Sequence, residues 1–141
     1  MSTYYDYPDS YISEILNRVK TIALVGASPR VDRDSHICMR FLLCRGYRII
    51  PINPHEEGSF ILNQRCYARI TDVQEKIDMV DIFRSSEAAL DVTAEALDND
   101  IGVIWMQLGV VNQQAETLAL GRGADVIMDR CPKIEIEKRH G

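Results

Sequence analysis

Short apolar runs alternate along the chain with segments of helical spacing. Five runs are predicted as strands, at residues 21–26, 47–52, 78–83, 102–106 and 124–128. The first reads Thr-Ile-Ala-Leu-Val-Gly without alternation of polar and apolar positions, which is typical of a strand buried on both faces. The second ends at Asn53-Pro54, because proline lacks an amide donor and favours extended geometry before it.

In most of the segments around these runs, apolar residues recur at the spacing of an α-helix. Helices are expected from residue 9 or 10 to about 19, from 34 or 35 to 45, from 85 or 86 to 97, and from 113 to about 120. The second would carry Ile37, Phe41 and Cys44 on one face, and Asn112 would cap the fourth. Residues 55–67 look irregular and polar, with a helical turn expected at 72–76.

Strands separated by helices predict parallel pairing with helices on both faces of the sheet. We expect an α/β, Rossmann-like fold with a five-stranded parallel sheet of order 3-2-1-4-5, counting the strands along the chain. The 141 residues fit one domain, residues 1–141, in which residues 1–20 form an N-terminal helical extension.

In such sheets ligands bind beyond the carboxyl ends of the strands, where the strand order reverses, here expected between the first and fourth strands. Five loops would meet there, at residues 26–33, 53–54, 84–86, 107–109 and 129–131. In the first loop, Gly26 permits close backbone approach and Ser28 offers a hydroxyl. The following helix start and the guanidinium groups of Arg30 and Arg33 favour a phosphate.

A dinucleotide is disfavoured at this loop. Residues 26–31 contain a single glycine instead of the GxGxxG pattern, and Asn53 stands where an acidic residue would hold the ribose.

Charge and composition narrow the range of partners that we expect. The formal charge of −5 argues against a nucleic-acid surface. No apolar run approaches a membrane span, and residues 1–8 lack the pattern of a signal peptide, so we expect a cytoplasmic protein without a membrane partner. The spacing of the four cysteines matches no metal or disulfide framework, and no metal site is expected.

No catalytic residue is assigned. The three histidines are interpreted as surface or structural groups, and Trp105 as strand packing. Cys131 is the one candidate nucleophile, because neighbouring Arg130 could lower its pKa. The favoured interpretation is passive: residues 130–132 form a turn that shapes the wall of the groove.

Several motifs together resemble the small bacterial and archaeal CoA-binding proteins, and through them the N-terminal CoA-binding domain of the succinyl-CoA synthetase α subunit. The resemblance runs from about Thr21 to the C-terminus. The motifs are residues 25–28, Asp32-Arg33 with Ser35, Gly46-Tyr47 with residues 51–54, and residues 78–84, 105–110 and 128–131.

The resemblance implies coenzyme A as the cofactor and a small-molecule ligand, CoA or an acyl-CoA, as the partner. Gly26, Ala27 and Ser28 would lie along the pyrophosphate, with Arg33 near the phosphates. The adenosine would contact Ile52, Asn53 and Pro54, and the rest of the groove would be lined by Phe83, Arg84, Met106 and Gln107. The favoured function is binding without catalysis. Two alternatives remain: a CoA-using enzyme or subunit, through thiol exchange at Cys131 or together with a partner chain, and a binder of NAD(P) or another adenine nucleotide. A protein partner is possible but not indicated.

Overall fold

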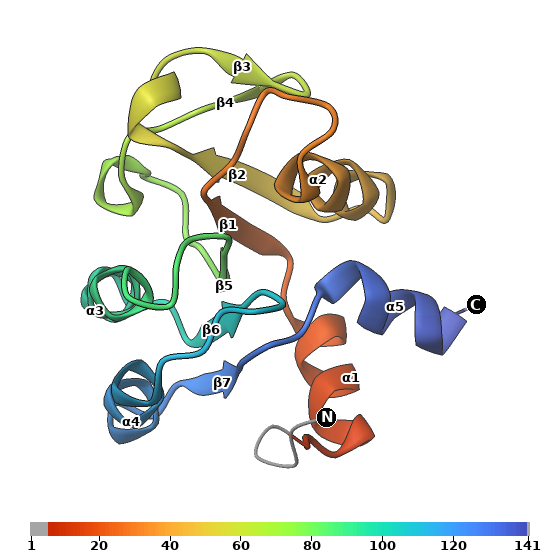
Figure 1. Cartoon of the computed structure of the whole chain (residues 1–141), viewed down its shortest axis with the longest axis vertical. Coiled ribbons are helices and arrows are strands. Elements are labelled where there is room, and N and C mark those ends of the chain that lie inside the picture. The colour runs from red at the N-terminus through yellow and green to blue at the C-terminus, as the bar shows by residue number, and fades with distance from the viewer. Residues whose placement is uncertain (1–5, 141) are drawn as a thin grey trace.

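The computed structural model describes residues 6–140, and its centre is a five-stranded parallel sheet (Figure 1). The strands are β1 (Thr21–Val25), β2 (Arg48–Ile52), β5 (Met79–Ile82), β6 (Val103–Met106) and β7 (Asp125–Ile127). All four strand pairs are parallel, so the expected α/β Rossmann-like fold is confirmed. Residues 1–5 of the expected N-terminal extension and Gly141 lie outside the described residues.

The expected strand order 3-2-1-4-5 is wrong. The observed order is β2-β1-β5-β6-β7, which in chain order is 2-1-3-4-5. Pro51 supplies the physical reason, because a residue without an amide hydrogen suits an edge strand and not the interior position that the expected order gives to β2. The point where the order reverses therefore lies between β1 and β5, not between β1 and β6.

A small hairpin covers the outer edge of β2. It consists of β3 (Phe60–Ile61) and β4 (Gln64–Arg65) and follows the 3-10 turn η1 (Pro54–Glu56). Tyr67 continues this cover: its amide donates to Pro51 O (3.0 Å), and its carbonyl accepts from Asn53 N (2.9 Å). The stretch expected to be irregular thus closes an otherwise open sheet edge.

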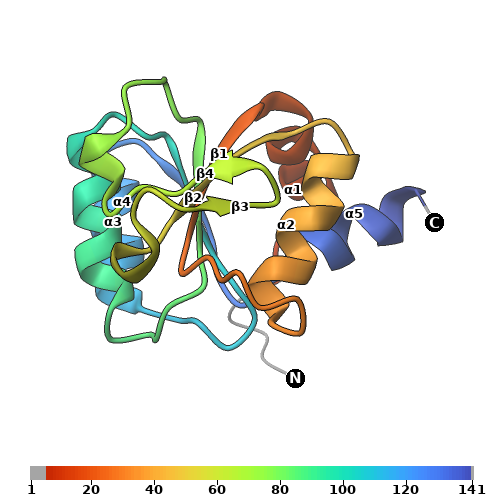
Figure 2. The same cartoon turned by 90° about the horizontal axis from the view of Figure 1, so that it is seen from above.

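Helices cover both faces of the sheet (Figure 2). On one face lie α3 (Ala89–Asp98) and α4 (Gln113–Gly121); on the other lie α1 (Asp9–Arg18), α2 (Asp34–Cys44) and α5 (Pro132–His140). Each face has its own apolar core. Ala23 and Val25 of β1 enter the α3 and α4 core, whereas Ile22 and Leu24 enter the other, because successive residues of a strand point to opposite faces.

Three helical predictions need correction. The buried residues of α2 are Ser35, His36, Cys38, Met39 and Leu42, whereas Cys44 of the expected face is exposed. The helix turns Cys38 and Leu42, one turn apart, toward the sheet. The helix expected from residue 85 or 86 starts at Ala89, and the turn expected at 72–76 is the 3-10 turn η2 (Ile70–Asp72).

Helix α5 is absent from the sequence prediction, which places only a turn at residues 130–132. Its start follows a known rule, because proline is favoured at the first position of a helix and Pro132 occupies that position. Other expectations are confirmed: the Asn112 side chain caps α4 by accepting from Ala115 N (2.9 Å), and Trp105 is fully buried in β6. Within residues 6–140, no helix has the length and apolar character needed to cross a bilayer.

Candidate functional site

The loop after β1 packs tightly against the ends of β2 and β5 at the carboxyl edge of the sheet. Gly26 has a φ of +96°, and a Cβ placed on it would lie 2.5 Å from the carbonyl oxygen of Phe83. The Gly26 amide donates to Ile52 O (3.0 Å), and Phe83 N donates to Val25 O (2.8 Å). Only glycine therefore lets the ends of β2, β1 and β5 converge here.

Side chains on both sides fix the shape of this loop. Asn53 Nδ2 donates to Ala27 O (2.8 Å), and Asn53 Oδ1 accepts from His55 N (2.9 Å). Behind the loop, Nδ1 of the buried His36 lies 2.9 Å from Ser28 O. His36 thus holds α2 against the loop, in agreement with its structural interpretation.

Two pockets open at this edge, one on each face of the sheet. We call the first the α3-side pocket; its volume is about 670 Å³. It is lined by Val25, Gly26, Ile52, Asn53, Pro54, His55, Ala68, Arg69, Ile70, Arg84, Val92 and Glu95. Its walls are mainly apolar, and one of its two arginines, Arg69, is paired with Glu95 (3.2 Å).

The second, which we call the α5-side pocket, has a volume of about 420 Å³. It is lined by Asp34, Ile37, Cys38, Phe83, Arg84, Gln107, Leu108, Val110, Cys131, Lys133 and Ile134. Both volumes fall in the usual range of ligand pockets, about 300–1,000 Å³. Arg84 lines both pockets, so the end of β5 joins them.

Seven of the twelve predicted site residues line these pockets: Gly26, Ile52, Asn53, Pro54, Phe83, Arg84 and Gln107. Ala27, Ser28, Arg30 and Arg33 belong to the adjoining loop without lining either pocket, and Met106 is fully buried in the core. Arg30 pairs with Asp32 (3.3 Å). Among residues 6–140, Arg33 and Arg84 form no side-chain ion pair, so both guanidinium groups are available to an anion.

Cys131 immediately precedes α5 and lines the α5-side pocket. The bond from the Cys38 thiol is the largest cause that lowers the pKa of Cys131 to about 6, against the opposing effect of burial. The amides of Ile134 and Lys133 and the side chain of Gln107 act in the same direction. The position of Cys131 at a helix start acts in the same direction, because the positive end of the helix dipole favours the thiolate form.

Cys38 and Asp81 continue this cluster into the core. Cys38 Sγ lies 4.0 Å from Asp81 Oδ2. Its hydrogen bond to Cys131, together with burial, raises the pKa of Cys38. Complete burial, reinforced by the charge on Cys131, raises the pKa of Asp81 well above its usual value. The three groups are therefore coupled: the pKa of Cys131 is lowered, whereas the pKa values of Cys38 and Asp81 are raised.

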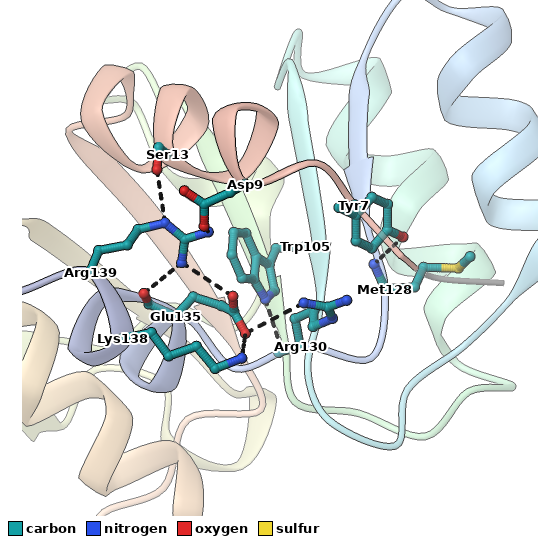
Figure 3. Close-up of polar contacts among 9 residues, drawn as sticks. All are labelled: Tyr7, Asp9, Ser13, Trp105, Met128, Arg130, Glu135, Lys138 and Arg139. Carbon is teal, nitrogen blue, oxygen red and sulfur yellow. Dashed lines mark hydrogen bonds and ion pairs between the residues drawn. The ribbon is translucent and has the colours of Figure 1, made fainter. Parts of the chain in front are cut away.

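A second polar network anchors the first turns of α5 (Figure 3). Glu135 is 3% exposed and contacts Arg139 (3.2 Å), Lys138 (3.4 Å) and Arg130 (3.7 Å). Trp105 Nε1 donates to Arg130 O (2.8 Å), which ties the residue before Cys131 to β6. Arg130 therefore contributes to the site by anchoring α5, while the hydrogen bonds that lower the pKa of Cys131 come from other residues.

The sequence interpretation does not assign Cys38, Asp81 or the start of α5 to the site. Pro132 is a local signal for that helix start. The contact between Cys38 and Asp81, which are 43 positions apart, has no local signal, because packing of α2 on β5 creates it.

A parallel α/β sheet with ligand-sized pockets at its switch point is the arrangement in which α/β proteins commonly bind nucleotides. Residues 20–137 match the family model described as a CoA binding domain, and the chain belongs to that family. The resemblance seen in the sequence is thereby confirmed.

Individual relatives are similar to most of this chain. The uncharacterized protein YneT of Bacillus subtilis is 40% identical over 123 residues, which cover 87% of this chain and 90% of that protein. The solved structure of a hypothetical protein from Pyrococcus horikoshii OT3 is 35% identical with a TM-score of 0.92, covering 100% of this chain and 98% of that one. The ADP-forming acetate–CoA ligase II of Archaeoglobus fulgidus is 28% identical over 125 residues, which cover 86% of this chain but 17% of the ligase.

Proposed function

We propose that the protein binds coenzyme A or an acyl-CoA across the two pockets, as a binding protein without acyl transfer of its own. The observation that carries this proposal is the pair of pockets joined at Arg84 in a chain of the CoA-binding domain family. CoA has two dissimilar ends, an adenosine with a 3′-phosphate and a pantetheine arm with a thiol, linked by a pyrophosphate.

We assign the adenosine to the α3-side pocket. Ile52, Pro54 and Val92 offer apolar surface to a planar base, and Asn53 and His55 lie at the same wall. A pocket with mainly apolar walls and a few polar groups is the usual form of a nucleoside site.

The pyrophosphate would cross the loop between the pockets. Gly26 brings the backbone close to this point, and Arg84 and Arg33 supply positive charge without an ion-pair partner among residues 6–140. The start of α2 adds the positive end of a helix dipole beside Arg33. The pantetheine arm would then enter the α5-side pocket, past Phe83 and toward Cys131.

The experiment measures thermal unfolding with CoA, acetyl-CoA and NAD. At 100 times its dissociation constant, a ligand that binds only the native state stabilises by about 2.7 kcal/mol. We expect a rise of about 8 °C in Tm for this chain length with CoA and a much smaller rise with NAD. Equal shifts with both ligands, or none with CoA, would contradict the proposal.

A protection experiment tests the orientation. Pantetheine should slow the alkylation of Cys131 by iodoacetamide, whereas adenosine 3′,5′-bisphosphate should leave it unchanged. The opposite pattern would show that the adenosine end, and not the pantetheine arm, lies near Cys131. Release of free thiol from acetyl-CoA by the protein alone would favour the enzyme alternative.

A further inference from the structure

The α5-side pocket contains a group of side chains that ligand binding alone does not require. Cys131 and Cys38 both line the pocket, and Asp81 lies behind Cys38 at 4.0 Å. These three residues come from the start of α5, from α2 and from β5, so their meeting depends on the tertiary fold.

Gln107 gives an independent indication that a ligand reaches this group. Its side chain lines the same pocket and is 7% exposed, yet its Oε1 atom has no hydrogen-bond partner among the described residues. The same side chain is among the groups that lower the pKa of Cys131. A buried amide oxygen without a partner suits an N–H donor that enters the pocket, and the pantetheine arm carries two secondary amides.

We propose that the α5-side pocket is a thiol–disulfide exchange site, at which Cys131 forms a mixed disulfide with the pantetheine sulfur of a CoA disulfide. The identity of the disulfide rests on the proposed function. Cys131 is the nucleophile, and Cys38 is a positioning residue that stabilises the thiolate.

The reaction is a balanced exchange. The Cys131 thiolate attacks one sulfur of the CoA disulfide, the bond between Cys131 Sγ and that sulfur forms, and the disulfide bond of CoA breaks. The electron pair of the broken bond leaves with the second CoA as a thiolate, which takes a proton from water. Cys131 is thereby oxidised and one CoA is reduced, and a further thiol reverses the step.

At acidic pH, Cys131 should react faster than a cysteine with an ordinary pKa. At pH 5.5, a thiol of pKa about 6 is roughly one-quarter thiolate, whereas an ordinary thiol of pKa about 8.5 is on the order of 0.1% thiolate. Lower intrinsic nucleophilicity offsets roughly a tenfold part of this advantage. We therefore expect Cys131 to form the adduct about tenfold faster than the exposed Cys44.

The test is a short pulse of CoA disulfide at pH 5.5 on the full chain, followed by acid quenching and mass mapping of all four cysteines. The expected result is a stoichiometric CoA adduct on Cys131 before adducts elsewhere. Adducts at equal rates on Cys44 and Cys131, or no adduct on Cys131, would overturn the proposal. Cys131→Ser should remove the fast adduct.

Two variants of Cys38 test its positioning role. Cys38→Ser keeps a hydrogen-bond donor, so the midpoint of the pH profile for Cys131 modification should stay near that of the wild type. Cys38→Ala removes the donor, and the midpoint should move upward by about one pH unit. An unchanged midpoint in Cys38→Ala would overturn the role of Cys38.

Two further ligands separate this proposal from the proposed function. S-methyl-CoA cannot exchange and reports binding alone by calorimetry, whereas pantethine is a disulfide without the nucleotide. Binding of S-methyl-CoA without any Cys131 adduct would overturn only the exchange site. Rapid reaction with pantethine without binding of S-methyl-CoA would overturn only the CoA assignment and support the exchange site.

Discussion

The two pockets share Arg84 but differ in how their polar groups are satisfied. In the α3-side pocket, Glu95 pairs with Arg69 and accepts from Thr71 Oγ1 (2.8 Å). In the α5-side pocket, Gln107 Oε1 lacks a partner among the described residues, and the pKa of Cys131 is lowered. Satisfied groups among apolar walls suit recognition of a fixed shape, whereas unsatisfied groups beside a thiolate suit chemistry.

The largest expected effect comes from the glycine at which the ends of β2, β1 and β5 converge. Gly26→Ala should reduce the free energy of unfolding by about 2–4 kcal/mol and weaken binding at both pockets, because the new Cβ meets Phe83 O and the backbone has a positive φ. Urea unfolding and calorimetry with CoA measure the two effects.

Gly58→Ala is the matched control for this variant. Gly58 has a φ of +82°, but a Cβ placed on it would meet no atom within 4 Å. Only backbone strain of about 1 kcal/mol is therefore expected, without loss of CoA affinity. If both variants lose the same free energy of unfolding, glycine is required at position 26 by its positive φ and not by the close approach of Phe83.

The next effect concerns the residue that joins the pockets. Arg84→Ala should weaken CoA binding by about 1.5–3 kcal/mol, the contribution of hydrogen bonds to a charged group, and should flatten its salt dependence. Isothermal titration at two salt concentrations measures this change.

Arg30→Ala removes a neighbouring arginine that is exposed and already paired with Asp32, so the affinity should change by less than about 0.5 kcal/mol. A larger loss in Arg30→Ala than in Arg84→Ala would move the anion site from the junction to the rim of the loop.

The smallest effect on thiol reactivity is expected at Asp81. Asp81→Asn keeps an oxygen that can accept from the Cys38 thiol, so the rate of Cys131 modification should stay within about twofold of the wild type. Stability should respond differently to pH. Because the pKa of Asp81 is raised in the folded state, the wild type loses stability as pH rises above the unfolded pKa, and the variant lacks this loss.

Asp81→Asn should therefore gain stability relative to the wild type at pH 7, with a smaller gain at pH 4. Urea unfolding at the two values measures it. The quantity to compare is the free energy of unfolding of the variant minus that of the wild type. If this difference is smaller at pH 7 than at pH 4, Asp81 is ionised in the folded protein.

Local patterns predicted the five strands of the parallel sheet, but not the short hairpin of β3 and β4, and they predicted which residues lie at the carboxyl edge of the sheet. Gly26, Asn53 and Pro54 follow directly on buried strands, and the carboxyl ends of parallel strands bring such residues together. The strand order required a choice between partners far apart in the chain, and Pro51 is the local cue that favours the edge position.

The thiol side of the site was harder to predict. Helix α5 is rich in charged residues, so its apolar pattern is weak, and Pro132 is its clearest start signal. The position of Cys38 depends on which face of α2 meets the sheet, and the apolar residues of that helix allow more than one choice. The pKa of Cys131 depends on the start of α5 and on the position of Cys38. The neighbouring Arg130 was therefore not sufficient to predict why this pKa is lowered.

The hydrogen bond between Trp105 and the carbonyl of Arg130 gives the protein a built-in optical probe. Trp105 is the single tryptophan of the chain, and its indole is bonded to the residue that precedes Cys131. Disulfides quench tryptophan emission at short range, so a change in the oxidation state of Cys131 should alter the intrinsic fluorescence without any added label. The same buried ring that packs β6 against α5 thus makes events in the neighbouring pocket visible in real time.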